Sequence, residues 1–414
     1  MRVLIAGFDL FRSVGGGQTF YRSVIERNPA VRFFYFRENE PADARRSANA
    51  FPITYRPHYG PHSLPGFAEP DAANGAVGEF LAANNLARAA AQCGHGFDVL
   101  DTPDYERMGP FLPGAMRRHG TDAGKVVVSM HGAISTTIAL AWGGSGKKPR
   151  HTVALERMQF DAADGRYCIS PAYRDEWRGY SAQPAHYLDP MWFFAPPAPK
   201  PYRPLPGPPT VLFVGRTDKG KGPHLFVQLV WWLPPDCYRD AVIVGPPVTD
   251  AHGRSSTDLL RNMAIARRMS HRVRIEGAKT PGELTELYAT NVLPVISSQH
   301  DTLNLVALES LFSGCPTVVS TGAGAHRYLR ERFPTVPFVP FDLGRFYADL
   351  PKVEDALRRY DDRRAELATA LKGVDFTPQT PPLTAIYDAP LAFDPSARAE
   401  ADTMERKLGE QLEL

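Results

Sequence analysis

The chain has 414 residues, of which 43% are hydrophobic and 22% charged, with a formal net charge of +2. This length exceeds what one ordinary hydrophobic core needs and accommodates two domains. Basic residues cluster only in short pairs such as Arg117-Arg118, so the charge gives no reason to expect a nucleic-acid partner. The four cysteines have no paired spacing, which indicates reduced thiols rather than a disulfide framework or a zinc site.

The sequence has no segment typical of a membrane span or a secretory signal. No run approaches the roughly 18 apolar residues that a spanning helix needs. Met1 leads directly into the apolar strand 2–6, without the basic region and long apolar stretch of a signal peptide. We therefore expect a cytoplasmic protein, and contact with the inner face of a membrane stays open.

The first half of the chain alternates short apolar strands with helices. Strands are predicted at 3–6, 31–36, 97–100 and 126–130, with helices from Gln18 and over 77–91. This alternation is typical of a parallel sheet covered on both faces. The stretch 40–73 is rich in Pro, Gly and Asn, and we predict that it is an irregular excursion from the domain.

A proline-rich segment, 194–209, separates the two halves, because proline fixes φ and removes an amide donor. After it, strands are predicted at 210–214, 241–244, 273–275, 293–296 and 317–320, with helices from Pro223 and over 281–288 and 304–312. The pattern predicts two doubly wound Rossmann-like α/β domains, residues 1–200 and 201–390, followed by a helix in 391–414. Ligands of such sheets bind outside the carboxyl ends of the strands, in a cleft between the domains.

The segment 211–222 is the strongest local motif. An apolar strand ends at Gly215, and a glycine-rich turn with Arg216 and Lys221 leads into a helix. Backbone amides at a helix start, together with cations, suit a phosphate or pyrophosphate. Gly222 stands where the Ser or Thr of a P-loop would hold magnesium, which argues against an ATPase. A basic surface turn is the alternative interpretation.

A second motif lies in 297–316. Asp301 precedes a predicted helix, and Glu309 follows about two turns later among apolar neighbours. A buried glutamate needs polar partners, for which ribose hydroxyls are suitable, and a structural arginine is the alternative partner. The amides near Asn304 and Leu305, at the helix start, suit phosphate oxygens.

These motifs resemble the retaining GT-B glycosyltransferases of family 4, the group 1 glycosyltransferases. Gly215-Arg216 and Lys221-Gly222 match the family's strand-Gly-Arg and Lys-Gly, and Asp301 and Glu309 stand in register with its Glu-x7-Glu signature. Further positions that resemble the family are Gly245, Gly277 and the segment 314–320. In the first half, Gly15 to Gly17 is similar to the acceptor-side glycine loop, and His131 stands where the family has a histidine facing the donor sugar.

The resemblance implies a GT-B glycosyltransferase that moves a sugar from a nucleotide-diphosphate donor to a glycan or lipid-linked acceptor with retention, as in polysaccharide biosynthesis. It implies that Arg216 and Lys221 neutralise the leaving diphosphate, Glu309 holds the ribose, Asp301 the sugar hydroxyls, and His131 a sugar hydroxyl or the developing positive ring. The donor-binding residues that it implies are Gly16, Gly17, Gly215, Gly277, Asn304 and Leu305. It also implies that the C-terminal helix packs back on the first domain. The chain has no Asp-x-Asp pair, so we expect neither a metal nor a cofactor.

Two departures from the family pattern leave alternatives open. Asp301 replaces a glutamate and Asn304 replaces a glycine, so a non-catalytic nucleotide-sugar binding protein is one alternative. A sugar-nucleotide epimerase on the same fold is another, and it predicts conversion of the donor without an acceptor. A two-Rossmann oxidoreductase is disfavoured, because its nearest fingerprint, at 322–327, lacks the third glycine.

Overall fold

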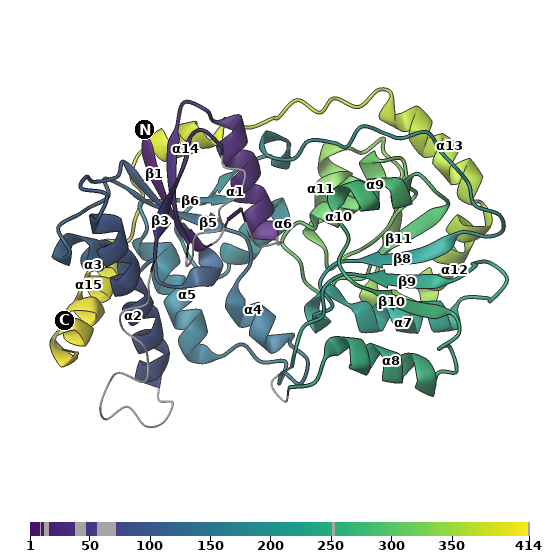
Figure 1. Cartoon of the computed structure of the whole chain (residues 1–414), viewed down its shortest axis with the longest axis horizontal. Coiled ribbons are helices and arrows are strands. Elements are labelled where there is room, and N and C mark those ends of the chain that lie inside the picture. The colour runs from purple at the N-terminus through teal and green to yellow at the C-terminus, as the bar shows by residue number, and fades with distance from the viewer. Residues whose placement is uncertain (9, 12–15, 38–46, 56–71, 251–252, 413–414) are drawn as a thin grey trace.

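The computed structural model describes residues 1–8, 10–11, 16–37, 47–55, 72–250 and 253–412. The described residues form two lobes, each built on one sheet with helices on both of its faces (Figure 1). The predicted doubly wound α/β architecture is therefore confirmed.

The first sheet has seven parallel strands in the order β3-β2-β1-β4-β5-β6-β7. Its strands are β1 Arg2–Phe8, β2 Arg32–Arg37, β3 Ala50–Thr54, β4 Val99–Pro103, β5 Val126–Met130, β6 Gly165–Cys168 and β7 His186–Tyr187. Its helices are α1 Gly16–Arg27, α2 Ala72–Ala91, α3 Leu112–Arg118, α4 Ile134–Ala139, α5 Arg150–Ala162 and α6 Pro171–Trp177, with short 3-10 turns η2 Asp104–Glu106 and η3 Pro190–Trp192. The central strands are buried on both faces, as expected for a parallel sheet covered by helices.

The second sheet has six parallel strands in the order β10-β9-β8-β11-β12-β13. Its strands are β8 Thr210–Val214, β9 Ala241–Val244, β10 Val273–Glu276, β11 Val292–Ile296, β12 Val318–Ser320 and β13 Val339–Phe341. Its helices are α7 Pro223–Trp232, α8 Ser256–Ala266, α9 Pro281–Tyr288, α10 Leu305–Phe312, α11 Gly324–Arg332, α12 Phe346–Arg358 and α13 Tyr360–Leu371, with 3-10 turns η4 Lys219–Lys221 and η5 Leu343–Arg345. The order reverses beside β8, so the loops after β8 and β11 lie at the topological switch point.

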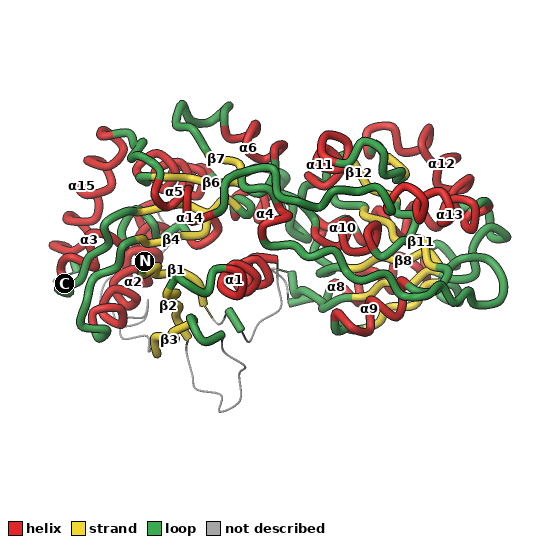
Figure 2. The backbone as a smooth tube through the Cα atoms, turned by 90° about the horizontal axis from the view of Figure 1, so that it is seen from above, coloured by secondary structure: helices red, strands yellow, loops and turns green. Residues whose placement is uncertain are grey.

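The chain crosses between the lobes twice, first through the predicted proline linker and again after α13 (Figure 2). The returning segment contains α14 Leu383–Asp388 and α15 Pro395–Gln411. The hydroxyl of Tyr387 on α14 donates to Asp101 at 2.6 Å, and Arg398 on α15 donates to Asp164 at 2.8 Å. Both helices therefore rest on the first domain, and the return begins before residue 391.

One prediction about the first domain is wrong. Residues 50–54, placed within an irregular excursion, form the edge strand β3, which pairs in parallel with β2. The side-chain amide of Asn49 anchors its start by donating to the carbonyl oxygens of Ile25 and Val31. Pro52 obscured the pattern, but a proline is tolerated on an edge strand because one side of that strand needs no donor. Residues 40–46 and 56–71 of the excursion lie outside the described residues.

Candidate active site

The loops after β8 and β11 meet at the carboxyl end of the second sheet. The Ser297 hydroxyl donates to the Gly222 carbonyl at 2.7 Å, and the Gln299 amide donates to the Gly220 carbonyl at 2.8 Å. Gly222 has φ +76°, and a β-carbon there would lie 1.9 Å from the Ser297 carbonyl oxygen. Only glycine permits this approach, so the Lys-Gly pair of the motif has a structural reason.

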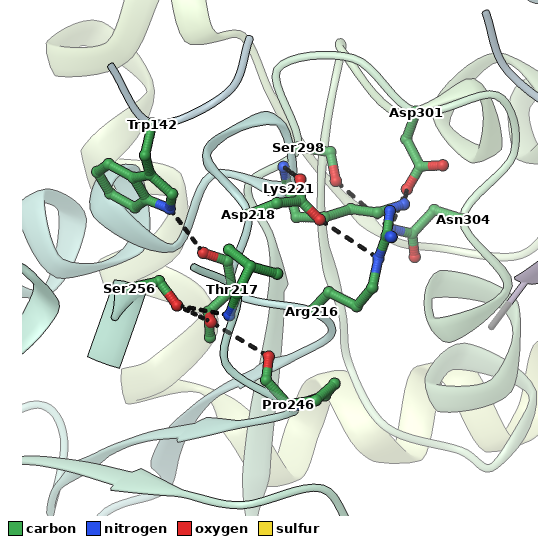
Figure 3. Close-up of polar contacts among 11 residues, drawn as sticks. Trp142, Arg216, Thr217, Asp218, Lys221, Pro246, Ser256, Ser298, Asp301 and Asn304 are labelled. Carbon is green, nitrogen blue, oxygen red and sulfur yellow. Dashed lines mark hydrogen bonds and ion pairs between the residues drawn. The ribbon is translucent and has the colours of Figure 1, made fainter. Parts of the chain in front are cut away.

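Three of the predicted site residues form one polar group in this place (Figure 3). Lys221 Nζ lies 2.5 Å from Asp301 Oδ2, and the side-chain amide of Asn304 donates to the same oxygen at 2.8 Å. The Asp301 side chain is only 10% exposed. The charge on this carboxylate is therefore compensated within the protein, as a nearly buried charge requires.

Asn304 also determines how α10 begins. Its backbone has φ +73°, and its side-chain oxygen accepts from the amide of Ala307 at 3.0 Å, which makes it the N-cap. The amides of Leu305 and Val306 have no acceptor among the described residues. Helix α10 thus presents two free donors beside Lys221, and the Asn304 side chain occupies the third.

Arg216 lies near these three residues, but its side chain pairs with Asp218 instead of with them. Its side chain is 56% exposed, and its Nε lies 3.4 Å from Asp218, the residue that caps η4. Gly215 precedes it, and a β-carbon on the neighbouring Gly245 would lie 1.8 Å from the Gly215 carbonyl oxygen. Arg216 is therefore an accessible cation on a turn whose backbone is tightly packed against the end of β9.

Glu309 lies half-buried on α10, one face of which packs in the core. Within the described part of the chain, its carboxylate has no hydrogen-bond or ion-pair partner, and burial raises its pKa. The alternative of a structural arginine partner is therefore wrong. Arg364, a buried arginine, instead donates to the carbonyl of Tyr288 and the hydroxyl of Tyr360.

The facing edge of the first domain presents neutral polar groups. His131 follows β5, and its ring packs against Phe20 and Tyr21, with ring centroids 4.6 and 5.5 Å apart. Burial lowers the pKa of His131 to about 3, so the imidazole is neutral at physiological pH. Its Nε2 atom is buried and has no partner in the described structure.

Asp104 holds the backbone of this edge, and the sequence analysis did not single it out. Its carboxylate accepts from the amides of His131 at 2.9 Å and Gly132 at 3.1 Å and from the Tyr173 hydroxyl at 2.8 Å. Burial raises the pKa of Asp104 to about 6. The available signal was its place directly after β4, where the strand's carboxyl end meets the same sheet edge as β5.

Two of the predicted glycines begin α1, and a third lies apart. Gly16 and Gly17 are the first residues of that helix rather than a loop before it, and Gly15 lies outside the described residues. A β-carbon on Gly17 would lie 2.7 Å from the Tyr105 hydroxyl, so Gly17 closely approaches the aromatic group around His131. Gly277 follows the edge strand β10, where a β-carbon would meet open space.

The two edges face each other across the junction of the lobes. A β-carbon on Gly132 would lie 3.2 Å from the hydroxyl oxygen of Thr302. In the sequence, Thr302 stands between Asp301 and Asn304. The indole of Trp142, in the loop after α4, donates to the Thr217 carbonyl at 2.9 Å (Figure 3). The fold therefore places the His131 edge beside the Lys221–Asp301–Asn304 group.

Two further properties concern metals and membranes. Within the described residues, no three His, Cys, Asp or Glu side chains are grouped so that they could hold a metal ion. None of the helices there is both long and apolar enough to cross a bilayer. The expectation that neither a metal nor a cofactor takes part stays a prediction.

Comparison with known proteins finds sequence similarity over part of the chain. Residues 198–342 match the model of the family Glycosyl transferases group 1. The D-inositol 3-phosphate glycosyltransferase of Corynebacterium diphtheriae is 32% identical over 116 residues, which are 27% of this chain and 26% of that protein. The enzyme of the same name from Nocardia farcinica is 28% identical over 130 residues, 30% of this chain and 28% of that protein. The match spans only about a quarter of the length of these curated relatives.

Similarity of fold extends over the whole chain. The sucrose-phosphate synthase of Thermosynechococcus elongatus superimposes with a TM-score of 0.62 at 18% identity, covering 99% of both chains. HepE of Anabaena, in complex with UDP and glucose, superimposes with a TM-score of 0.61 at 13% identity, covering 100% of this chain and 99% of that one. The resemblance predicted from the motifs is thus confirmed: the chain has the GT-B fold, and its second domain carries the pattern of the group 1 glycosyltransferases.

Proposed function

We propose that the protein is a glycosyltransferase that transfers a sugar from a nucleotide-diphosphate donor with retention of anomeric configuration. The observation that carries the proposal is the group of Lys221, exposed Arg216 and the free amides of α10 at the switch point of the second sheet. Cations and unpaired amides are the donors that a diphosphate needs. The match to the group 1 family over this same domain supports the proposal.

The proposed chemistry follows from where charge develops. As the glycosidic bond breaks, negative charge builds on the β-phosphate, and Lys221 and Arg216 neutralise it. Lys221 first has to exchange its contact with Asp301 for the phosphate, since the two side chains are paired in the free protein. Asp301 is then released toward the sugar hydroxyls, so that donor binding itself frees the carboxylate that orients the sugar.

Glu309 and His131 complete the proposed site. The carboxylate of Glu309 lacks a partner in the described structure, and ribose hydroxyls would supply the missing donors. The neutral imidazole of His131 has a free Nε2 that suits a sugar hydroxyl. Closure of the two lobes around the donor would exclude water and limit its hydrolysis.

UDP is the nucleotide that we propose to test first, because HepE, which shares the fold, was solved with UDP. The acceptor is proposed to be a glycan or a lipid-linked glycan in polysaccharide assembly. The inositol phosphate in the names of the curated relatives is not carried over to this chain, because the match spans only about a quarter of the length of those proteins.

A thermal-shift screen with UDP, GDP, ADP and CMP tests the donor site. A nucleotide at about 100 times its dissociation constant stabilises the folded state by about 2.7 kcal/mol. We expect one diphosphate to raise the Tm of the wild type, and Arg216→Ala and Glu309→Ala to lose most of that rise. If no diphosphate does so at millimolar concentration, the proposal is wrong.

The reaction class is tested with the nucleotide that binds. Release of the diphosphate from its sugar conjugate, measured with and without candidate acceptors and in the presence of EDTA, is expected for a metal-independent transferase. Conversion of the donor sugar without release would identify an epimerase. Binding without either reaction would identify a nucleotide-sugar binding protein.

A further inference from the structure

Three helices of the second domain expose large hydrophobic side chains on the surface, and on two of them these side chains are aromatic. Nine large hydrophobic side chains are exposed in the described structure: Met1, Ile138, Tyr180, Leu205, Trp231, Trp232, Ile265, Tyr347 and Leu391. Trp231 and Trp232 end α7, Ile265 lies on α8 and Tyr347 begins α12, whereas the other five are dispersed over the rest of the chain. Concentration of such side chains in one place marks an interaction site.

Three of these aromatic rings form a continuous row. The ring centroids of Trp231 and Trp232 lie 4.8 Å apart, and those of Trp232 and Tyr347 lie 5.4 Å apart. The guanidinium of Arg267, just after α8, lies 5.4 Å from the Trp231 ring. We call Trp231, Trp232, Tyr347 and Arg267 the aromatic surface.

Packing of the domain does not require these rings. The core face of α7 is supplied by Phe226, Val227 and Val230, which are buried completely. Trp231 and Trp232 are 46% and 47% exposed, and Tyr347 is 61% exposed. Large aromatic areas left in water are costly unless something covers them.

Two arginines at the end of α8 carry positive charges that no other described residue compensates, and one of them lies over the Trp231 ring. In the described part of the chain, the guanidinium groups of Arg267 and Arg268 have neither a hydrogen bond nor an ion pair with another residue. Asp236, in the loop between α7 and β9, is already paired with Arg358 at 3.0 Å, and Arg358 also contacts Glu354 at 2.8 Å. Exposed indole and phenol rings beside unpaired arginines complement the headgroup region of an anionic bilayer.

We propose that the aromatic surface binds the protein to a membrane that contains anionic phospholipids. A glycan is the less suitable occupant, because the rings are inclined to one another by 56° and 88° and offer no common plane on which sugars could stack. A lipid interface needs no such plane, since each ring inserts independently among the headgroups.

The position of the aromatic surface suits an enzyme at a membrane. Helix α7 begins next to Gly222 in the candidate active site, and the tryptophans lie at its other end, about 15 Å away for ten helical residues (Figure 1). The membrane would therefore contact the second domain without covering the face that meets the first. This inference goes beyond the proposed donor chemistry and does not depend on it.

Cosedimentation with phosphatidylglycerol-containing vesicles and with pure phosphatidylcholine vesicles tests the inference. We expect the wild type to pellet with the anionic vesicles, less so at high salt. The double substitution Trp231→Ser/Trp232→Ser is expected to lower the partition coefficient at least tenfold. Arg267→Glu/Arg268→Glu is expected to lower it by roughly fivefold or more for each arginine. The matched control, Tyr180→Ser/Leu391→Ser, removes two exposed hydrophobic side chains elsewhere and should bind like the wild type.

The Tm of each variant without nucleotide serves as the folding control, because it reports folding whether or not the proposed donor site is correct. Failure of the wild type to bind anionic vesicles, or equal binding by the tryptophan and control variants, would overturn the inference. So would a concentration-dependent dimer in solution that the tryptophan substitutions abolish, because a second copy would then be the occupant. If the tryptophan variant does not fold, the arginine variant decides the outcome. If the wild type binds anionic vesicles but binds no nucleotide, only the proposed function is refuted and the membrane inference stands.

Discussion

The two edges of the candidate active site stabilise their polar side chains in different ways. At the edge of the second domain, the charges of Lys221 and Asp301 compensate each other. The edge of the first domain carries groups made neutral or held by backbone amides: burial lowers the pKa of His131 to about 3 and raises that of Asp104 to about 6. In the proposed reaction, Lys221 on the charged edge exchanges its ion pair with Asp301 for the diphosphate. The opposite edge would contact the uncharged sugar through the neutral imidazole of His131, whose backbone amide Asp104 holds.

The largest effect is expected from removing the cation of the charged edge. Lys221→Met should lower the rate of donor cleavage by about 100- to 1000-fold, because the leaving diphosphate loses a positioned positive charge. The measurement is release of the nucleoside diphosphate from the sugar donor. Lys219→Met is the matched control, since this lysine lies on the same short 3-10 turn and makes no ion pair in the described structure. Equal losses in both variants would mean that general surface charge matters, and not the Lys221 position.

Glu309→Gln should change nucleotide binding and protein stability in opposite directions: binding becomes weaker, and the folded state becomes more stable at pH 8. Loss of a charge-assisted bond to the ribose is expected to weaken nucleotide binding by about 10- to 100-fold. Burial raises the pKa of Glu309, so its contribution favours the folded state at low pH and is lost as pH rises through that raised pKa. The Gln variant should therefore unfold at a higher temperature than the wild type at pH 8, with the difference vanishing near pH 4. A destabilised variant at pH 8 would show that Glu309 has a partner in solution.

On the neutral edge, Asp104→Asn should lower the rate of donor cleavage by about tenfold, the loss expected when one positioned hydrogen bond of roughly 1.4 kcal/mol is weakened. The Asp104 carboxyl takes up a proton near pH 6, and protonation removes acceptors from the His131 and Gly132 amides. The wild-type pH–rate profile should therefore rise with a midpoint near 6, and the variant should lack this limb. If the limb persists in the variant, another group titrates there and Asp104 has a purely structural role.

The smallest effect is expected from Asn304→Gly. Glycine keeps the φ of +73° without strain, removes the side-chain contact to Asp301, and leaves the Ala307 amide only its long 3.3 Å bond to the carbonyl of residue 304. Nucleotide binding, measured by calorimetry, should become about fivefold tighter, because one more helix amide faces the diphosphate. Asn304→Ala is the comparison, since a β-carbon without an amide at this φ costs about 1–2 kcal/mol of stability. Weaker binding by the Gly variant would show that the asparagine amide itself contacts the donor.

The sequence alone was sufficient to predict which residues form the charged edge, because they lie within two short segments of the chain. Gly215, Arg216, Lys221 and Gly222 lie within one strand-turn-helix unit, and Asp301 and Glu309 lie within another. Parallel strands end at the same edge of a sheet, so two local motifs were enough to predict a shared place and a phosphate-binding chemistry. The alternation of strands and helices likewise predicted both doubly wound domains and the linker between them, because each element needs only its own hydrophobic pattern.

The neutral edge and the exposed aromatic residues depended on the tertiary structure. The three hydrogen-bond donors to Asp104 come from the loop after β5 and from α6, between 27 and 69 residues away along the chain. The lowered pKa of His131 arises from burial beside aromatic residues of α1. Nothing in a local pattern distinguishes a tryptophan that faces the core from one that faces solvent, so the row of Trp231, Trp232 and Tyr347 was also invisible. The chain determined these features by itself, but through burial and long-range packing, whose energies depend on which segments become neighbours.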